Sequence, residues 1–449
     1  IAQRIVLIGD AGQLTDGRHP VVDAVRKHIT LDKKTTVLFL GDNLYRNGLP
    51  DSMSKSYYRD RAVLDSQLSV ADSTDAKVIM IPGNHDWQNG SRGGYDAIVR
   101  QQLYVTFKYM NNDKVRYYPE DGCPGPVVRN LDNDVVLILF DSQWWLHPYD
   151  KPEIESDCQC KTKDELVTQI KDIATKNSKK LIILACHHPF KSNGPHGGFF
   201  TLKQHIFPFT DLRPNLYLPL PLIGSAYPVA RSVFGAPQDL KHPSYTNMIE
   251  EVTDAVKTVA PNVIFVAGHE HNLELIKEDG YNYVISGGGC KTNRASESRN
   301  SEFISPATGF SVMEISRNKN VTIDFYTVLD SMKKVHSSTL LNFTPARITD
   351  TITLEVMAAA NLPDSVLRPA SKQFPAVNGL RKFFMGQNYR QEWSAPVKMK
   401  TFDIDKEQGG FFVFGVGGGT QTKSLSLRQT RDTTGKEWVL RRIEKSSLV

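Results

Sequence analysis

Five short polar blocks in the first 271 residues of this 449-residue chain carry aspartate, asparagine, tyrosine and histidine, side chains that bind metal ions. The blocks are Gly9-Asp10-Ala11-Gly12, Gly41-Asp42-Asn43-Leu44-Tyr45, Gly83-Asn84-His85-Asp86, His187-His188-Pro189 and Gly268-His269-Glu270-His271. Carboxylate and amide oxygens combined with imidazole nitrogens suit iron, manganese or zinc rather than copper or a cluster. Two such ions side by side can bind a phosphate, lower the pKa of a bound water and stabilise a leaving oxygen. The blocks therefore contain the ligands that a binuclear phosphoesterase needs.

Each block stands at the end of an apolar run that we interpret as a buried strand. Four blocks follow their run directly, after residues 5–8, 37–40, 181–186 and 263–267, and the block at Gly83 follows residues 78–81 with Pro82 between. Sheets of the α/β class bind their ligands at the carboxyl ends of strands. We therefore expect the five blocks to form one site.

Helix-like segments alternate with these strands at the start of the chain. Helices are expected at 21–29, 57–68, 95–108, 163–174 and 244–259, and further strands at 126–129, 135–140, 273–277, 281–286, 310–315 and 321–328. The alternation predicts an α/β domain in which 321–328 is the last strand.

The composition is that of an ordinary soluble globular protein, with 40% hydrophobic and 23% charged residues. A net charge of +5 helps to attract a small phosphorylated substrate. No Lys/Arg run is interleaved with aromatic residues, so nucleic-acid binding is not indicated. No stretch of 18 apolar residues is present, so no transmembrane segment is predicted in this chain.

The five cysteines show no doubled Cys-x-x-Cys spacing of a zinc site. Cys123 lies in one polar loop, and Cys158 and Cys160 lie in a later one, so a disulfide there and free thiols are equally compatible with the sequence. Cys186 ends a predicted strand and is expected in the core.

The order of the five blocks, GDxG, GDxx, GNHD, a later His and GHxH, resembles the metallophosphoesterase (calcineurin-like) superfamily and, within it, the purple acid phosphatases. The resemblance covers roughly residues 4–330. It implies a four-layer αββα sandwich of two mixed β-sheets flanked by helices. It also implies ligands for two ions that share Asp42. The first ion, Fe(III) in purple acid phosphatases, would be bound by Asp10, Asp42, Tyr45 and His271. The second, a divalent iron, zinc or manganese ion, would be bound by Asp42, Asn84, His187 and His269.

The resemblance assigns roles to residues that are not ligands. His85 matches a residue that binds the substrate and stabilises the transition state, and Asp86 is expected to orient its ring. His187 matches the ligand better than His188, because the family's ligand lies two residues before the proline. His196, nine residues after His187, matches the family's histidine that would donate a proton to the leaving group.

Tyr45 separates purple acid phosphatases from the wider superfamily. The unperturbed pKa of tyrosine is near 10, so the phenol is a poor ligand for most divalent ions near neutral pH. A highly charged ion such as Fe(III) can displace the phenolic proton. The alternative is that Tyr45 only packs against its loop.

The favoured function is a binuclear-metal phosphomonoesterase of the acid phosphatase type, in which a metal-activated hydroxide attacks the phosphate in line. One alternative is a phosphodiesterase or nucleotide hydrolase of the same superfamily. Another is a binding module without enzymatic activity, in which the metal centre only stabilises the fold.

The domain organisation follows from where the metal-binding types of residue end along the chain. The catalytic domain is expected at 1–335, with a Pro-, Phe- and Leu-rich insertion at 190–244 that we interpret as a lid over the site. Residues 345–449 are expected to form a small β-containing appendage or linker, in a natural chain that continues further. An Fe(III) site and possible disulfides favour an exported protein, whether periplasmic, secreted or at the cell surface.

Overall fold

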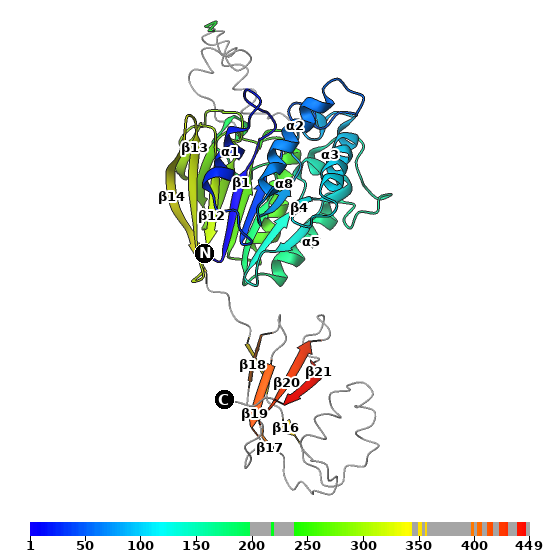
Figure 1. Cartoon of the computed structure of the whole chain (residues 1–449), viewed down its shortest axis with the longest axis vertical. Helices are drawn as coiled ribbons and strands as arrows, with labels where there is room; N and C mark the ends of the chain where they lie inside the picture. Colours follow the sequence, from blue (N-terminus) through cyan, green and yellow to red (C-terminus); the bar gives the residue numbers. More distant parts are fainter. Residues whose placement is uncertain are drawn as a thin grey trace. The chain divides into compact units, whose positions relative to one another are not determined.

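The chain divides into two compact units, Ile1–Pro345 and Ala346–Val449. The computed structural model describes residues 1–197, 217–219 and 238–343, and the backbone of strands between residues 349 and 445 (Figure 1). The predicted lid at 190–244 lies largely outside the described residues, because 198–216 and 220–237 are not among them.

The first sheet of unit 1 contains β1 at its centre. Strands β1 to β4 are parallel to one another, and β12 to β14 extend the sheet from β1 as antiparallel neighbours. The order is β14 (Met332–Asn342), β13 (Asn320–Val328), β12 (Gly309–Ile315), β1 (Gln3–Ile8), β2 (Thr35–Phe39), β3 (Lys77–Met80) and β4 (Val115–Tyr117).

The second sheet contains four parallel strands in its middle, with antiparallel strands outside them. The order is β11 (Ser301–Ser305), β9 (Leu273–Glu278), β10 (Tyr281–Ser286), β8 (Val263–Ala267), β7 (Leu181–Ala185), β6 (Val135–Leu139) and β5 (Val127–Asn130). Both sheets are therefore mixed, as predicted.

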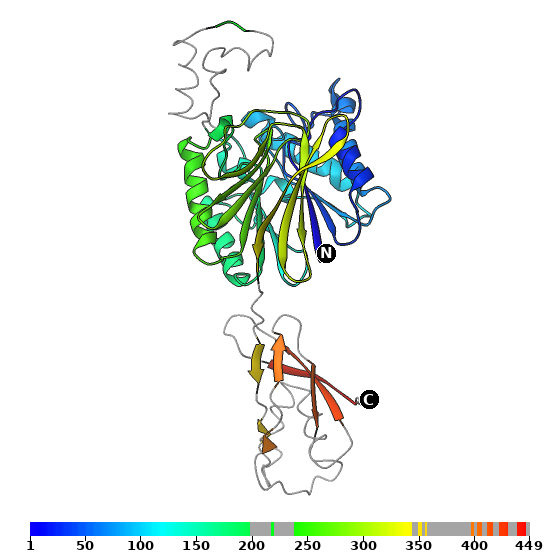
Figure 2. The same cartoon turned by 90° about the vertical axis from the view of Figure 1, so that its left-hand side faces the viewer.

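Alternation along the central strands separates three cores. On β1, Ile5 and Leu7 belong to the core between the two sheets, whereas Val6 and Ile8 pack beneath helices. The first sheet is covered by α1 (Pro20–His28), α2 (Tyr57–Leu68) and α3 (Gly94–Lys108). The second is covered by α4 (Ser142–Leu146), α5 (Lys163–Lys176) and α8 (Pro243–Lys257) (Figure 2). The prediction of a four-layer αββα sandwich is confirmed.

Local sequence explains where α5 begins and which face it buries. The hydroxyl of Thr162 accepts the backbone N–H of Glu165, whose carboxylate accepts the N–H of Lys161. Leu166 and Ile170, one turn apart, are buried against the second sheet. Among the described residues, no helix combines the length and the apolar character needed to cross a membrane.

The prediction that 321–328 is the last strand of the domain is wrong. β14 follows it and pairs antiparallel with β13, so the expected boundary at residue 335 falls inside a strand. β14 lies at the sheet edge and is largely polar, with Lys333 and Lys334 exposed. Two register shifts also interrupt its pairing. Edge strands of this kind lack the apolar alternation on which the prediction depended. The short strand β11 and the helix α4 were missed as well.

Unit 2 contains β-strands, as expected for the C-terminal appendage. β15 (Thr349–Ile352) pairs with β18 (Phe402–Asp405), and β16 (Glu355–Val356) pairs with β17 (Val397–Lys398). The third sheet consists of β19 (Phe411–Gly415), β20 (Thr422–Gln429) and β21 (Trp438–Lys445).

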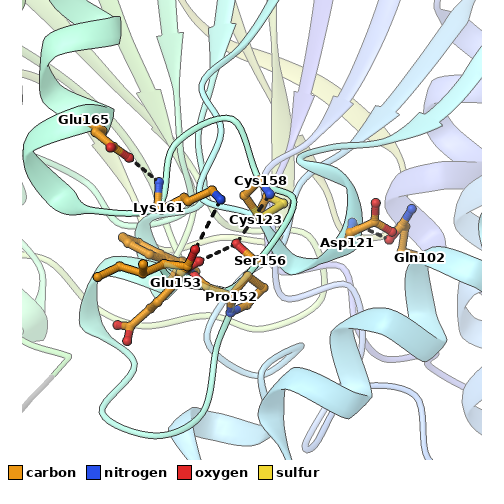
Figure 3. The surroundings of a disulfide bond; sticks show 11 residues. Gln102, Asp121, Cys123, Pro152, Glu153, Ser156, Cys158, Lys161 and Glu165 are labelled. Carbon is orange, nitrogen blue, oxygen red and sulfur yellow. Dashed lines mark hydrogen bonds between the residues drawn. A yellow bond between two sulfur atoms is a disulfide. The ribbon is translucent and has the colours of Figure 1, made fainter.

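A disulfide joins Cys123 to Cys158 across 35 residues of sequence (Figure 3). It ties the segment before β5 to the loop after α4. The thiol of Cys160 is free and buried, and Cys186 is buried as expected.

We predict that replacing both Cys123 and Cys158 by serine lowers the free energy of unfolding by roughly 3–4 kcal/mol, because the loop they close is long. Denaturant unfolding monitored by tryptophan fluorescence measures the difference. A reducing agent should destabilise the wild-type protein but not the double variant. Equal stability of the two proteins would show that the crosslink adds nothing.

Candidate metal centre

The carboxyl ends of strands from both sheets meet at one edge of unit 1. The backbone N–H of Gly9, after β1, donates to the carbonyl of Ser286 at the end of β10, at 2.7 Å. The ring Nδ1 of His187, after β7, lies 2.8 Å from the carbonyl oxygen of Leu40, after β2. These contacts join the two sheets where the five blocks lie, so all seven predicted ligands come together.

The first group of donor atoms surrounds the phenol of Tyr45. Its oxygen lies 3.0 Å from Oδ1 of Asp10 and 3.1 Å from Nε2 of His271. The same Nε2 lies 3.5 Å from Oδ1 of Asp10. Two donors that each lie about 2.1 Å from one ion are separated by roughly 3 Å. The three atoms therefore fit the coordination shell of a single ion.

The second group surrounds the side-chain oxygen of Asn84. This Oδ1 lies 3.0 Å from Nε2 of His187 and 3.1 Å from Nδ1 of His269. The two ring nitrogens are 3.2 Å apart. Because His187 points its other nitrogen at a backbone carbonyl, Nε2 is the nitrogen turned toward this group.

Asp42 lies between the two groups. Its Oδ1 is 3.4 Å from Nε2 of His187, in the second group. Its carboxylate also lies with ligand atoms of Asp10 and His271 within 4.8 Å of one another, in the first group. The structure thus places Asp42 where a bridging carboxylate would stand.

Three candidate ligands have left-handed backbone conformations, with φ of 58° at Asp10, 52° at Asp42 and 70° at His269. Such a conformation costs about 1–2 kcal/mol for a non-glycine residue, and strain of this kind concentrates at functional sites. Gly41 (φ 89°) makes room for the ring of His187, because a Cβ there would lie 2.6 Å from its Nδ1. The backbone at the site therefore adopts conformations that are unfavourable elsewhere in a protein.

The electrostatics of the site favour a cation. Asp10 and Asp42 are almost fully buried. Burial, together with the charge of Asp42, raises the pKa of Asp10 well above its usual value. Burial and the nearby Lys291 ammonium lower the pKa of His271 to about 3, so this imidazole is neutral. Burial also lowers the pKa of His187. A bound cation would supply the positive charge that two buried carboxyl groups beside a neutral imidazole otherwise lack.

His188 contacts other partners through both ring nitrogens. Its Nδ1 lies 2.8 Å from the hydroxyl of Ser142, and its Nε2 lies 2.6 Å from the side-chain oxygen of Gln238. The geometry therefore favours His187 as the ligand, as the sequence indicated.

His85 lies at the rim of the first group. Its ring is 4.7 Å from that of Tyr45, and its Nε2 is 3.9 Å from Oδ2 of Asp42. Its Nδ1 lies 2.7 Å from the carbonyl oxygen of Arg46. The prediction that Asp86 orients His85 is therefore wrong, because a backbone carbonyl occupies the position at this nitrogen.

Asp86 instead holds the loop that carries Asp42 and Tyr45. Its buried carboxylate accepts the backbone N–H groups of Asn43 and Leu44, both at 3.1 Å, and of Gly83, at 2.8 Å. The side chain of Gln101 donates to it at 2.9 Å. Asp86 thus ties the block after β3 to the block after β2.

His196 reaches the site from the short helix η4 (Pro195–Gly197). Its ring centroid lies 4.1 Å from that of His269. Its Nδ1 lies 2.8 Å from Oδ1 of Asp239. The structure therefore brings His196 beside a candidate ligand of the second group.

The sequence did not indicate three residues at the site, of which two touch candidate ligands and one touches His196. The Nζ of Lys291 lies 3.0 Å from the ring centroid of Tyr45. The carbonyl oxygen of Gln238 lies 2.9 Å from Nε2 of His269, and Asp239 contacts His196. Lys291 follows the glycine run 287–289. Gln238 and Asp239 carry no recognisable motif.

Residues 3–218 match the family described as calcineurin-like phosphoesterase. The match includes four of the five blocks, and the fold brings the fifth, at His269 and His271, to the other four. Residues 3–218 thus contain a calcineurin-like phosphoesterase domain. This family uses metal ions and acts on phosphate esters.

Several solved structures are similar to this chain. GAP50, the anchor in the inner membrane complex of Plasmodium, is 15% identical with a TM-score of 0.46, over 77% of this chain and 90% of that one. The purple acid phosphatase PPD1 from yellow lupin (Lupinus luteus) seeds is 13% identical with a TM-score of 0.43, over 75% and 53%. A predicted phosphoesterase from Streptococcus pneumoniae is 13% identical with a TM-score of 0.25, over 75% and 98%. No curated protein sequence matches significantly.

We predict that chelation of bound metal destabilises unit 1, because the folded protein then loses the binding free energy of the ions. Returning metal at about 100 times its dissociation constant should restore roughly 3 kcal/mol of unfolding free energy. Thermal unfolding before and after chelation measures this change. In Asp42→Asn the gain in unfolding free energy on adding metal should be smaller. A thermal unfolding midpoint of the wild-type protein that does not change with metal would contradict the assignment of the metal centre.

Proposed function

We propose that unit 1 is a binuclear-metal phosphomonoesterase of the purple acid phosphatase type. The observation that carries the proposal is the pair of donor groups, one around Tyr45 and one around Asn84, that meet at Asp42. A site that only stabilised the fold would not need His85 and His196 at its rim. Both are present, and both lie within ring contact of a candidate ligand.

In this proposal Asp10, Tyr45 and His271 would hold Fe(III). Asn84, His187 and His269 would hold a divalent ion, and Asp42 would be shared by the two ions. When bound, the ions activate a water by lowering its pKa and neutralise the charge of the phosphate. The phenol of Tyr45 supports iron at the first position, because its oxygen faces the other donors instead of packing against the loop.

The remaining work falls to side chains of this chain. His85 holds a phosphate oxygen from the rim of the first group, and His196 gives its proton to the leaving oxygen as the ester bond breaks. The Lys291 ammonium over Tyr45 adds positive charge on the side of the first group. That charge favours a monoester dianion over the singly charged diester.

We predict that the metal-loaded protein hydrolyses p-nitrophenyl phosphate at least about tenfold faster, as kcat/KM, than bis(p-nitrophenyl) phosphate. Initial rates between about pH 4 and pH 8 measure the ratio. A range of pH is needed because a general acid works best near its own pKa. Asp42→Asn should lose at least about a hundredfold in kcat.

The two unfavourable outcomes of that assay differ in meaning. Faster turnover of the diester would replace the proposal by a phosphodiesterase. If protein with bound metal turned over neither ester, the proposal that unit 1 is an enzyme would be wrong.

We predict that protein loaded with iron shows a visible absorption band from tyrosinate bound to Fe(III), and that Tyr45→Phe abolishes it. The band requires a phenolate ligand on the ferric ion. Absorption spectra with metal analysis measure this. Tyr104→Phe is the matched control and should keep the band, because Tyr104 lies on α3 and its hydroxyl donates to Asp65 of α2. A band that survives Tyr45→Phe at equal iron content would contradict iron binding by this residue.

We further propose that the protein is exported. The Cys123–Cys158 disulfide supports this location, because such bonds persist mainly in oxidising compartments. Recovery of both cysteines as thiols from native cells after rapid alkylation would contradict it.

A further inference from the structure

The loop that carries His196 is anchored by a buried carboxylate. Glu270 is fully buried, and its Oε1 accepts the hydroxyl of Ser192 at 2.9 Å and the backbone N–H of His196 at 2.8 Å. Gly194 lies so close that a Cβ there would collide with this carboxylate. The backbone of His196 is therefore fixed against the turn after β8.

Glu270 stands between His269 and His271 in the chain. The turn that supplies one candidate ligand to each donor group thus also supplies the anchor for the loop of His196. Because one turn carries all three residues, it places the backbone of His196 relative to both donor groups.

A second buried carboxylate holds the ring of His196. Asp239 is 2% exposed, and its Oδ1 lies 2.8 Å from Nδ1 of the imidazole. The next residue, Leu240, donates its N–H to the carbonyl of His196 at 2.9 Å. Asp239 and Glu270 therefore fix the ring and the backbone separately, and the ring rests 4.1 Å from that of His269.

We propose that Asp239 and Glu270 are positioning residues that hold His196 in place to protonate the leaving group. This inference rests on the proposed phosphatase function. In the step concerned, the oxygen of the attacking hydroxide forms a bond to phosphorus, and the bond from phosphorus to the ester oxygen breaks. The electron pair of the broken bond stays on the ester oxygen, and a proton passes to that oxygen from the His196 ring. The alcohol then departs uncharged, and neither positioning residue touches the substrate.

The proposal makes the effect of each positioning residue depend on the leaving group. An alkyl phosphate releases a strongly basic alkoxide and needs the proton, and a positioned general acid accelerates such a step by about 10²–10⁴-fold. 2,4-Dinitrophenyl phosphate releases a weakly basic phenolate and needs little help. A merely structural defect would slow both substrates alike.

The experiment compares kcat on an alkyl phosphate and on 2,4-dinitrophenyl phosphate at equal metal content. Asp239→Ala and Glu270→Ala should each lose at least about tenfold on the alkyl ester and much less on the dinitrophenyl ester. Asp239→Asn and Glu270→Gln, which keep a hydrogen-bonding oxygen, should recover part of the loss. If an alanine variant does not fold, its conservative counterpart should still show the same selectivity at smaller amplitude. Glu251→Gln, on the surface of α8, is the control.

A double-mutant cycle completes the test. If Asp239 acts through His196, then His196→Ala with Asp239→Ala should be no slower on the alkyl ester than His196→Ala alone. Two results would overturn this inference and leave the phosphatase function standing. One is additive losses of kcat in the double variant. The other is an equal loss of kcat on both substrates in the single variants while the wild-type enzyme is active. A wild-type protein that turns over neither substrate would overturn both.

Discussion

The burial of two carboxylates at the junction of two sheets is the constraint on which this structure depends. Asp10 and Asp42 are almost fully buried, and burial lowers the pKa of His187 and His271 beside them. Taking carboxylates out of water costs several kcal/mol each unless a cation or hydrogen bonds compensate. Backbone N–H groups supply part of that compensation, from His269 to Asp10 and from His85 to Asp42. The remaining oxygens face donors spaced for metal ions.

The αββα architecture is what makes this arrangement possible. Parallel strands bring their carboxyl ends to one edge of each sheet, and packing two such sheets face to face brings the two edges together. The first sheet contributes the oxygen donors and the second contributes the imidazoles. Left-handed turns at Asp10, Asp42 and His269 then aim the side chains inward, at a conformational cost that the packed strands offset.

The residues nearest the strands could be predicted from sequence, and those that arrive from elsewhere could not. Asp42 and His187 follow apolar runs, so local pattern places them at a sheet edge. Asp239 contacts His196 from the far end of a long insertion, and no spacing in the sequence predicts such a contact. β14 was not predicted because it is a polar edge strand. Asp86 was found as part of a motif but given the wrong partner, because sequence proximity to His85 says nothing of where its carboxylate turns.

The central claim is that two ions share Asp42. Anomalous diffraction from crystals of metal-loaded protein, recorded at the absorption edges of iron and of the divalent metal, tests it most directly. The account predicts two peaks about 3.5–4 Å apart, one beside Tyr45 and one beside Asn84, with the Asp42 carboxylate between them. A single peak, or two peaks that do not both contact Asp42, would contradict it.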